Sequence, residues 1–368
     1  AGVQAFPDHE DMHRYLTKYA YHFDLIDKIR FKSRVVDICP EYDPKKGERP
    51  IWKVVLENGC QELFSSVVVA SGHLTRPLHV PMFQNDFRGQ YIHSHDYKAP
   101  EIFVGKRVCV VGVGNSACDM ATDLCSTAEA CILVARSGVL ILPKLFCGIP
   151  FTDITRKIQR PWIPSWLRRK LTAWLTYIVH GSMTKLGFKP LGQRAHVTSN
   201  GTIVTDIAYN RIKVKQGINR IDGQTIYFED GTSGEFDVLL AATGYMIDLP
   251  FISREIVPLE DNRLELFKRM VPPNWPGLYL MGFFNTDTAL NMVYEHQARW
   301  VRDIELGKAK LPTIADMEAD IAAKRRWVEA NYKASPRHTI EEEHVPYIRE
   351  LKKSMRRMRR LSNPQEIN

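Results

Sequence analysis

The spacing of apolar residues predicts an amphipathic helix near the start of the chain, followed by strands. Residues 9–23 carry apolar side chains at helical spacing, and Asp8 stands where an N-cap is expected. The residues that share this face are Met12, Tyr15, Leu16, Tyr19, Ala20 and Phe23. Two segments with several Val and Ile residues, 29–38 and 51–57, are typical of β-strands.

A second amphipathic helix is predicted inside a Pro- and Trp-rich insertion at about 142–190. Such a helix either lies on a membrane surface or packs over a substrate entrance, and the usual core-facing role of apolar helix faces favours packing. Its apolar face holds Trp166, Leu167, Leu171, Trp174, Leu175 and Ile178, beside Arg168, Arg169 and Lys170.

A short apolar run at 106–111 is followed by a G-x-G-x-x-A turn at Gly112, Gly114 and Ala117, and then by a helical pattern. This order is typical of a dinucleotide-binding turn in a parallel sheet. Gly112 allows a tight turn, Gly114 lets the backbone approach a pyrophosphate, and Ala117 allows close helix–strand packing. Asn115 and Ser116 would present N–H groups at the helix N-terminus to phosphate.

The next predicted strand indicates which nucleotide is bound. It ends at Arg136 and Ser137, and residues 130–149 contain no Asp or Glu. An acidic residue there would contact the ribose of NAD, whereas an arginine accommodates the 2′-phosphate of NADP. The sequence therefore predicts NADP.

An internal repeat predicts a second nucleotide-binding unit. Residues 56–72 and 228–244 each contain an Asn-Gly or Asp-Gly turn, a buried apolar run and a final A-[ST]-G. The two ends, Ser71-Gly72 and Thr243-Gly244, are predicted to pass close to a cofactor. The fold class is therefore α/β with two Rossmann-like dinucleotide-binding domains.

Only one of the two repeats has a glycine-rich opening turn. The second repeat opens at Gly112, and the same span would place the first opening before Ala1. The first domain is therefore expected to be incomplete. The chain would then be the C-terminal portion of a longer protein whose first βαβ unit is lost or unrecorded. The rival explanation is a natural protein that has discarded one of its two nucleotide sites.

The segment after Gly244 is predicted to return to the first domain. Residues 274–283 are predicted to form a strand that ends near Gly282, followed by a helix from about Thr288 to Arg299. The basic tail, 341–368, is expected to be a solvated end, or a contact with acidic partners.

Composition narrows the class of protein. The 368 residues are 44% hydrophobic and 25% charged, with a net charge of +8 that suits an anionic cofactor. The seven cysteines form no C-x-x-C pair, which indicates a reducing cytoplasmic location. No membrane span, nucleic-acid motif or metal site is predicted, and a homodimer is one assembly such a chain could form.

The string F-x-G-x-x-x-H-x-x-x-Y at Phe87, Gly89, His93 and Tyr97, close before the fingerprint, resembles the flavin-containing monooxygenase family. The resemblance extends from about Phe6 to Ile321. It includes the segments FPDHEDMHRYLTKYA, VVVASGH, GVGNSA, LLAATGY and EHQARW.

The resemblance implies a flavoprotein in which NADPH reduces FAD and O₂ then forms a flavin hydroperoxide. This species oxygenates a small substrate with a soft nitrogen or sulfur nucleophile. In this scheme Pro77, Pro81 and the Phe87–Tyr97 string form the linker between the domains, with the string beside NADP, and His93 either orients that junction or is structural. The resemblance also implies that the helix from about Thr288 points its N-terminus at the flavin. The asparagine that the family places near the flavin has no counterpart here, so no catalytic residue beyond the candidate His93 is assigned.

The expected domains are an FAD-binding domain (1–98 and 245–340), an NADP-binding domain (99–244) and the basic tail (341–368). Two other functions stay open. The first is a Baeyer–Villiger monooxygenase, which Tyr97 disfavours because those enzymes have tryptophan there. The second is a truncated NADP-binding protein without flavin activity.

Overall fold

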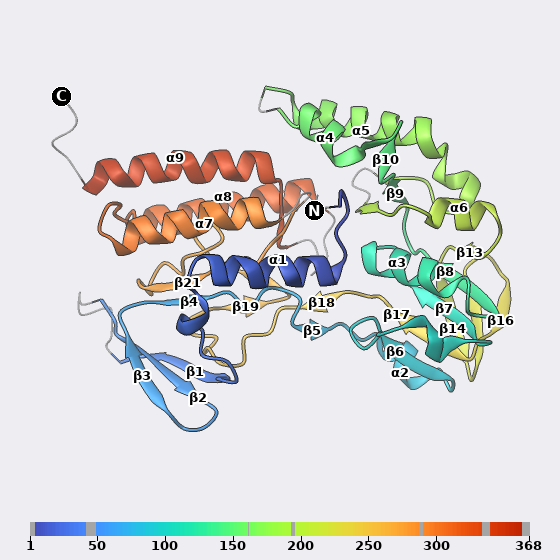
Figure 1. Ribbon diagram of the computed structural model, residues 1–368, viewed down its shortest axis with the longest axis horizontal. Helices are drawn as coiled ribbons and strands as arrows, with labels where there is room; N and C mark the ends of the chain where they lie inside the picture. The colour runs from blue at the N-terminus through green and yellow to red at the C-terminus, as the bar shows by residue number, and fades with distance from the viewer. Residues whose placement is uncertain are drawn as a thin grey trace.

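The computed structural model describes residues 4–41, 49–160, 162–192, 196–286, 290–332 and 339–362. Two units lie side by side along the longest axis (Figure 1). One is built on a five-stranded sheet, on the right of Figure 1, and the other on smaller sheets covered by long C-terminal helices.

The five-stranded sheet is fully parallel and has the order β13-β8-β7-β17-β6. Its strands are β6 (Gln90–His93), β7 (Arg107–Val111), β8 (Ala130–Val134), β13 (Ile212–Lys215) and β17 (Val238–Ala241). Helices α3 (Asn115–Leu124) and α6 (Ile203–Ala208) pack on one face. A sheet buried on both faces explains why β7 and β17 are continuous apolar runs.

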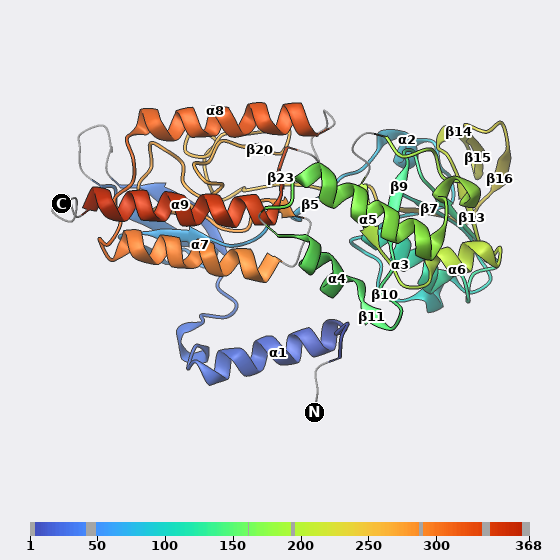
Figure 2. The same cartoon turned by 90° about the horizontal axis from the view of Figure 1, so that it is seen from above.

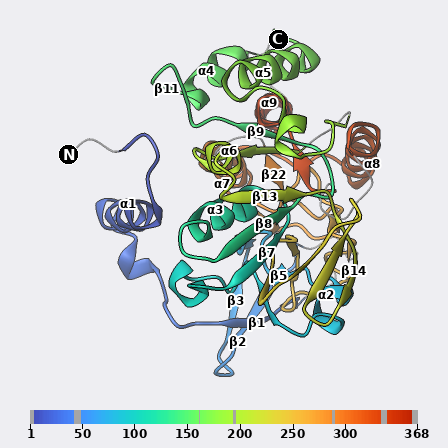
Figure 3. The same cartoon turned by 90° about the vertical axis from the view of Figure 1, so that its right-hand side faces the viewer.

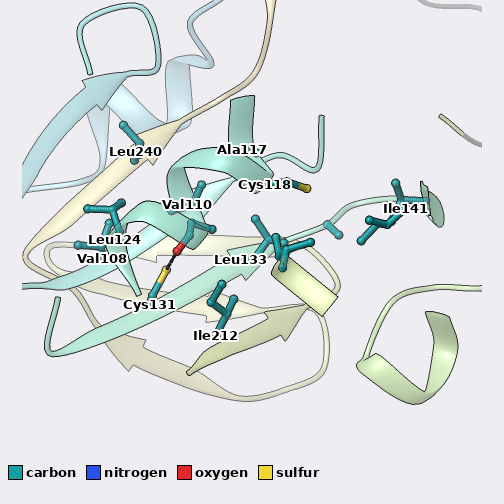
Figure 4. Packing of buried hydrophobic residues seen from close by; sticks show 14 of the residues in the cluster. Val108, Val110, Ala117, Cys118, Leu124, Cys131, Leu133, Ile141, Ile212 and Leu240 are labelled. Atoms are coloured by element: carbon teal, nitrogen blue, oxygen red, sulfur yellow. Dashed lines mark hydrogen bonds between the residues drawn. The ribbon is translucent and has the colours of Figure 1, made fainter. Parts of the chain in front are cut away.

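Figure 4 shows the core between α3 and this sheet. Ala117, Cys118 and Leu124 of α3 pack on Val108, Val110, Cys131 and Leu133 of β7 and β8. On the other face, Phe87 packs with residues of α2 (Pro81–Asn85) and the antiparallel sheet of β14 (Ile218–Asp222), β15 (Thr225–Phe228) and β16 (Ser233–Glu235).

The second unit repeats part of this arrangement. The antiparallel strands β1 (Val35–Pro40), β2 (Trp52–Leu56) and β3 (Gln61–Phe64) precede β4 (Val67–Val69), which pairs in parallel with β21 (Leu278–Leu280). Val67 of β4 and Leu239 of β17 stand at the same place in the repeat, and each lies in a parallel pairing, with Leu278 of β21 and with Tyr91 of β6. The predicted repeat is therefore present in three dimensions, including left-handed Gly59 and Gly231 at the two hairpin turns.

Short elements complete the two units. They are η1 (Ile26–Lys28), η3 (Pro100–Phe103), η4 (Met183–Leu186), β5 (Arg76–Pro77), β9 (Val139–Leu142), β10 (Leu145–Phe146), β11 (Ile149–Pro150), β12 (His196–Ser199), β18 (Tyr245–Met246), β19 (Leu259–Glu260), β20 (Arg263–Leu264), β22 (Asn285–Thr286) and β23 (Glu341–Glu342). β5 and β18 pair antiparallel between the two units.

The Phe87–Tyr97 part of the predicted linker is not a linker in the structure. Gln90–His93 is the outer strand of the five-stranded sheet, and Tyr97 stacks on Phe103 and bonds Asp123 of α3. A Cβ on Gly89 would lie 2.6 Å from the Phe87 ring, so glycine lets this ring fold back against the strand. The chain crosses between the units at β5, which contains Pro77, the start of the predicted linker. The string itself belongs to the five-stranded unit because its apolar residues pack in the core of that sheet.

The first predicted helix forms as α1 (His9–His22), and Asp8 caps it by accepting a hydrogen bond from the Asp11 N–H at 2.8 Å. None of its residues is buried. Figure 2 shows α1 beside the main body rather than packed into it. The apolar face of this helix is therefore uncovered.

The insertion is helical as predicted and contains α4 (Phe151–Ile158) and α5 (Ser165–His180). The predicted apolar face of α5 is only partly covered. Leu167, Leu171 and Leu175 are partly buried, but Trp166, Trp174 and Ile178 are exposed. The leucines and the exposed residues lie on adjoining strips of the helix, and only the leucine strip packs on the protein.

The expectation of a solvated tail is wrong for the described part of the C-terminus. Residues 344–362 form α9 (His344–Ser362), which packs on α7 (Leu290–Glu305) beside α8 (Ile314–Asn331). Tyr347, Leu351, Met355 and Met358 share one buried face at helical spacing. The basic residues lie on the other side, so net charge concealed an amphipathic helix.

We expect Tyr347→Phe to lower the free energy of unfolding by about 1–3 kcal/mol. The buried Tyr347 hydroxyl donates to the Lys268 carbonyl at 2.7 Å and accepts from Gln297 Nε2 at 2.9 Å, so its loss leaves two buried groups without a partner. Urea denaturation measures the change, and the exposed Tyr21→Phe is the control. Equal stability of the two variants would contradict an anchoring role for α9.

Candidate dinucleotide-binding site

The fingerprint turn lies at the carboxyl edge of the five-stranded sheet, between β7 and α3. Gly112 has a φ of +131°, and a Cβ there would lie 2.4 Å from the Ala242 carbonyl oxygen. Glycine is needed at this position because two backbone turns meet there. Glycine was predicted at position 112 because the turn is tight. The structure adds a second reason, which is the close approach of the Ala242 backbone.

The N-terminus of α3 faces this edge and can accept an anion. Its N-cap is Gly114, and no side chain caps the first turn. Ser116 is exposed beside it, and Ala117 is fully buried against the sheet. Uncapped N–H groups and the helix dipole favour a negatively charged group such as phosphate.

A segment that the sequence did not single out holds this turn in place. Thr198 Oγ1 donates to the Val113 carbonyl at 2.7 Å, and the Ser199 N–H donates to Asn115 Oδ1 at 3.0 Å. Asn200 Nδ2 donates to Asp119 Oδ1 at 2.7 Å. The side chain of Asn115 therefore positions the turn. These contacts join residues more than 80 positions apart in the sequence, so no local motif predicts them.

Arg136 and Ser137 follow β8 at the same edge. Both are exposed, whereas the preceding Ala135 is buried. The described residues offer the Arg136 guanidinium no carboxylate partner. A free cation beside the fingerprint turn suits an additional phosphate group.

Thr243 and Gly244 form the turn after β17, the strand next to β7. Gly244 has a φ of +94°, and its carbonyl accepts from the Leu78 N–H at 2.9 Å. Thr243 Oγ1 donates to the Leu78 carbonyl. This predicted cofactor turn is thus fixed to the chain that crosses between the two units.

His93 ends β6 beside this junction and is 1% exposed. Its Nδ1 accepts from the His95 N–H at 3.1 Å, which places the ring proton on Nε2. This Nε2 is buried and makes no hydrogen bond of good geometry among the described residues. The imidazole lies close to the Gly244 backbone, which opposes the lowering of the His93 pKa. Burial lowers the pKa of His93, and the neighbouring His79 lowers it further, so the imidazole is neutral near pH 7.

The other predicted cofactor residues gather in the second unit. Ser71 and Gly72 form the turn after β4, and Gly282 follows β21, with φ values of +80° and +78° for the two glycines. His73 Nδ1 lies 3.2 Å from the Gly282 carbonyl, which joins the two turns. Thr288 lies outside the described residues.

One edge of β4 is free in the part of the chain that the structure describes. β17 pairs with β7 on one side and β6 on the other, whereas β4 pairs only with β21. Beside β17 lies β7, the strand that carries the fingerprint turn, and β4 has only one neighbouring strand in the described chain. The second unit therefore shows the closing turn of a nucleotide site but no opening turn among its described residues.

Comparisons with known proteins identify the class. The family model described as "Flavin-binding monooxygenase-like" matches residues 3–361. The chain belongs to this family of flavoproteins, as its sequence motifs predicted.

Individual relatives agree with the family. The chain is 32% identical to flavin-containing monooxygenase 5 of Homo sapiens over 357 residues, which is 92% of this chain and 66% of the relative. It is 29% identical to dimethylaniline monooxygenase [N-oxide-forming] 2 of Rattus norvegicus, over 92% of this chain and 65% of the relative. The chain thus spans slightly less than two thirds of the length of these curated relatives.

The fold also matches solved structures. The S-allyl-L-cysteine S-oxygenase of Allium sativum superposes with a TM-score of 0.68 at 22% identity, over 99% of this chain and 74% of that one. This supports the mixed α/β flavoprotein fold. As for membranes, no helix among the described residues has both the length and the apolar composition to cross a bilayer.

We expect His93→Gln to flatten the pH dependence of stability below about pH 6.5. Because the pKa of His93 is lower in the folded chain, the unfolded chain binds an additional proton as pH falls below about 6.5, and stability falls with it. Removing this group should reduce the slope by up to about 1.4 kcal/mol per pH unit. Urea denaturation across this range measures it.

The exposed His13→Gln serves as the control, since it removes one histidine from the surface of α1. His73, His180 and His296 also have lowered pKa values and leave a residual slope in both variants. If His93→Gln and His13→Gln have the same slope, His93 accepts a proton in the folded chain.

Proposed function

We propose that this protein is an NADPH- and O₂-dependent flavoprotein monooxygenase that oxygenates soft nitrogen or sulfur nucleophiles. The family membership supports the reaction class. The observation that carries the nucleotide assignment is the cationic Arg136 at the same sheet edge as the uncapped N-terminus of α3. Activity, substrates and partners of the whole protein belong to this proposal, since the chain covers 66% of its relative's length.

NADPH would bind across the carboxyl edge of the five-stranded sheet. Its pyrophosphate would lie on the turn of Gly112, Gly114 and Ser116, where backbone N–H groups are available. Arg136 and Ser137 would contact the 2′-phosphate, and Thr243-Gly244 would border the nicotinamide half. The residues at this edge fit such a ligand because no side chain of the first turn of α3 occupies its N-terminus.

FAD fits the second unit in part. Gly72 and Gly282 bring two left-handed turns together through His73, and these turns would border the flavin with Ser71. A strand that carried the binding turn for the flavin pyrophosphate would pair with the free edge of β4. We therefore assign the residues above to FAD without assigning its phosphate site.

The flavin, when bound, supplies the reaction of O₂ and the transfer of one oxygen atom. The chain's own contribution is to hold the nucleotide and exclude water. The neutral His93 has an Nε2–H donor buried beside Gly244, at the junction of the two units. We propose that this donor orients the junction when nucleotide is bound.

The substrate class rests on relatives and on one residue. One relative is named an N-oxide-forming dimethylaniline monooxygenase, and one similar structure is an S-oxygenase. Tyr97, where Baeyer–Villiger enzymes have tryptophan, favours heteroatom oxygenation. Baeyer–Villiger chemistry and an NADP-binding protein without flavin are the alternative functions, and a cytoplasmic location is part of the proposal.

Arg136→Asp is expected to weaken NADP⁺ binding at least about tenfold and to change NAD⁺ binding much less. A carboxylate would repel the 2′-phosphate, which NAD⁺ lacks. Calorimetric titration of the 368-residue chain with each nucleotide gives both dissociation constants. The matched control is Arg88→Asp, an exposed arginine just before β6 at the opposite edge of the same sheet. An unchanged ratio of the two constants in Arg136→Asp would remove the assignment of Arg136.

The 368-residue chain by itself is expected to bind NADP⁺ without retaining FAD. The fingerprint turn of the five-stranded sheet is complete, whereas the free edge of β4 leaves the flavin pyrophosphate without a strand. Visible absorbance of the purified chain, followed by calorimetric titration with FAD, tests this. Stoichiometric flavin in a chain that does not bind NADP⁺ would reverse the assignment of the two units.

A further inference from the structure

One carbonyl group of the fingerprint turn is held by a side chain from a distant segment. The Val113 carbonyl, between Gly112 and Gly114, accepts a hydrogen bond from Thr198 Oγ1 at 2.7 Å. Thr198 is 0% exposed, so water does not compete for this bond. A weaker donor, the Cys118 thiol, has its Sγ 3.8 Å from the same oxygen.

This bond fixes the direction of a neighbouring N–H group. The Val113 carbonyl and the Gly114 N–H belong to one peptide bond, which is trans like the others in the described chain. In a planar trans peptide the C=O and N–H groups point in opposite directions. Because Thr198 holds the carbonyl toward β12, the Gly114 N–H points away from β12. No acceptor among the described residues bonds this N–H.

The direction of this peptide decides what the turn offers to an anion. A phosphate oxygen is attracted by an N–H dipole and repelled by a carbonyl oxygen. If the Val113–Gly114 peptide rotated by half a turn, an oxygen would replace the N–H. Glycine at position 114 makes such a rotation easy because it has no Cβ. The turn therefore needs a contact that selects one orientation, and Thr198 supplies it.

The two residues after Thr198 hold its strand against α3. The Ser199 N–H donates to Asn115 Oδ1 at 3.0 Å, and Asn200 Nδ2 donates to Asp119 Oδ1 at 2.7 Å. Asn200 is 5% exposed, and its Oδ1 accepts from two backbone N–H groups at the start of α6. The position of the Thr198 hydroxyl is therefore fixed by contacts with two helices.

The same strand is joined to the predicted 2′-phosphate contact. β12 pairs in parallel with β9, which lies above α3 in both Figure 1 and Figure 3. Gly138 alone separates Ser137 from β9, and a Cβ on Gly138 would lie 2.3 Å from the Pro190 carbonyl oxygen. The β9–β12 pair thus connects Arg136 and Ser137 with the fingerprint turn.

We propose that Thr198 is a positioning residue for the diphosphate of the bound nucleotide. Its hydroxyl keeps the Gly114 N–H directed at the phosphate oxygens, and it does not touch the nucleotide itself. The inference rests on the proposed function, which places the pyrophosphate on this turn. NADP⁺ and NAD⁺ share the diphosphate, so Thr198 acts on both alike, whereas Arg136 acts on the 2′-phosphate of NADP⁺ alone.

Calorimetric titration of the complete 368-residue chain tests the proposal. Thr198→Val keeps the branched shape but removes the hydroxyl, and it should weaken NADP⁺ and NAD⁺ binding by the same factor, about tenfold. Thr198→Ser retains a hydroxyl and should bind both nucleotides within about twofold of the wild-type chain. The probe 2′-AMP has a 2′-phosphate but no diphosphate, and it should bind Thr198→Val and the wild-type chain equally.

Thr176→Val is the matched control. Thr176 is also 0% exposed, and its Oγ1 donates to the Thr172 carbonyl at 2.9 Å, but it lies in α5 outside the site. This variant should bind both nucleotides as the wild-type chain does. Thermal unfolding of every variant without nucleotide confirms that each is folded at the temperature of the titration.

The Asn200–Asp119 pair offers a second test of the same contact. Asn200→Asp places two carboxylates within hydrogen-bond distance and should weaken the binding of both nucleotides, because β12 is then pushed from α3. Adding Asp119→Asn should restore binding, since the new amide can donate to the new carboxylate. The exchanged pair has the same net charge as the wild-type chain, so recovery reports the contact rather than the charge.

The possible failures are distinguishable. Equal affinity of Thr198→Val and the wild-type chain for both nucleotides would overturn the inference and leave the proposed function standing. A loss that Thr198→Ser shows in full, or that extends to 2′-AMP, would also overturn it, because the defect would then be a general one. A wild-type chain that binds neither nucleotide would overturn the proposed function, and the inference with it.

Discussion

The close approach of two backbone turns, at Gly112 and Ala242, is the constraint on which the candidate site depends. A side chain on Gly112 would meet the Ala242 carbonyl at 2.4 Å, so the turn after β7 and the turn after β17 can share one sheet edge only with glycine there. This contact brings the N-terminus of α3 beside Thr243-Gly244. Through Leu78, the same turn is bonded to the chain that crosses to the second unit. One steric requirement thus connects the nucleotide edge with the junction at which His93 is buried.

The duplication of the closing hairpin and strand explains how the two units are organised. β14–β17 and β1–β4 follow the same order, and each series ends in a left-handed glycine. They differ in what lies beside the last strand. β17 is flanked by strands on both sides, and β4 on one side in the described chain. The second unit instead draws its rigidity from the helical layer of α7, α8 and α9, in which Gln297 and Tyr347 connect the Gly282 turn to the core.

The sequence was informative wherever a local chemical requirement fixed the residue. The fingerprint at Gly112, the cap at Asp8 and both hairpin glycines needed no knowledge of distant contacts. The predictions were wrong where packing against distant residues determines the structure of a segment. The Phe87–Tyr97 string became a strand because the core of the sheet takes Phe87, and α9 was obscured by its positive charge. The bonds of Thr198 and Asn200 to the fingerprint could not be foreseen, since they join residues far apart in the chain. Periodicity located the apolar face of α5, but not whether a neighbour covers it.

The free edge of β4 has a further consequence for how the chain behaves in solution. A parallel strand with one unpaired edge presents backbone N–H and C=O groups as a template for a strand of another molecule. Val68, at the middle of β4, is 45% exposed, so one face of this strand is uncovered as well. Concentrated samples of the 368-residue chain should therefore form intermolecular β-structure more readily than a protein in which this edge is covered. Colloidal stability would then depend on a three-residue strand rather than on the surface charge of the whole chain.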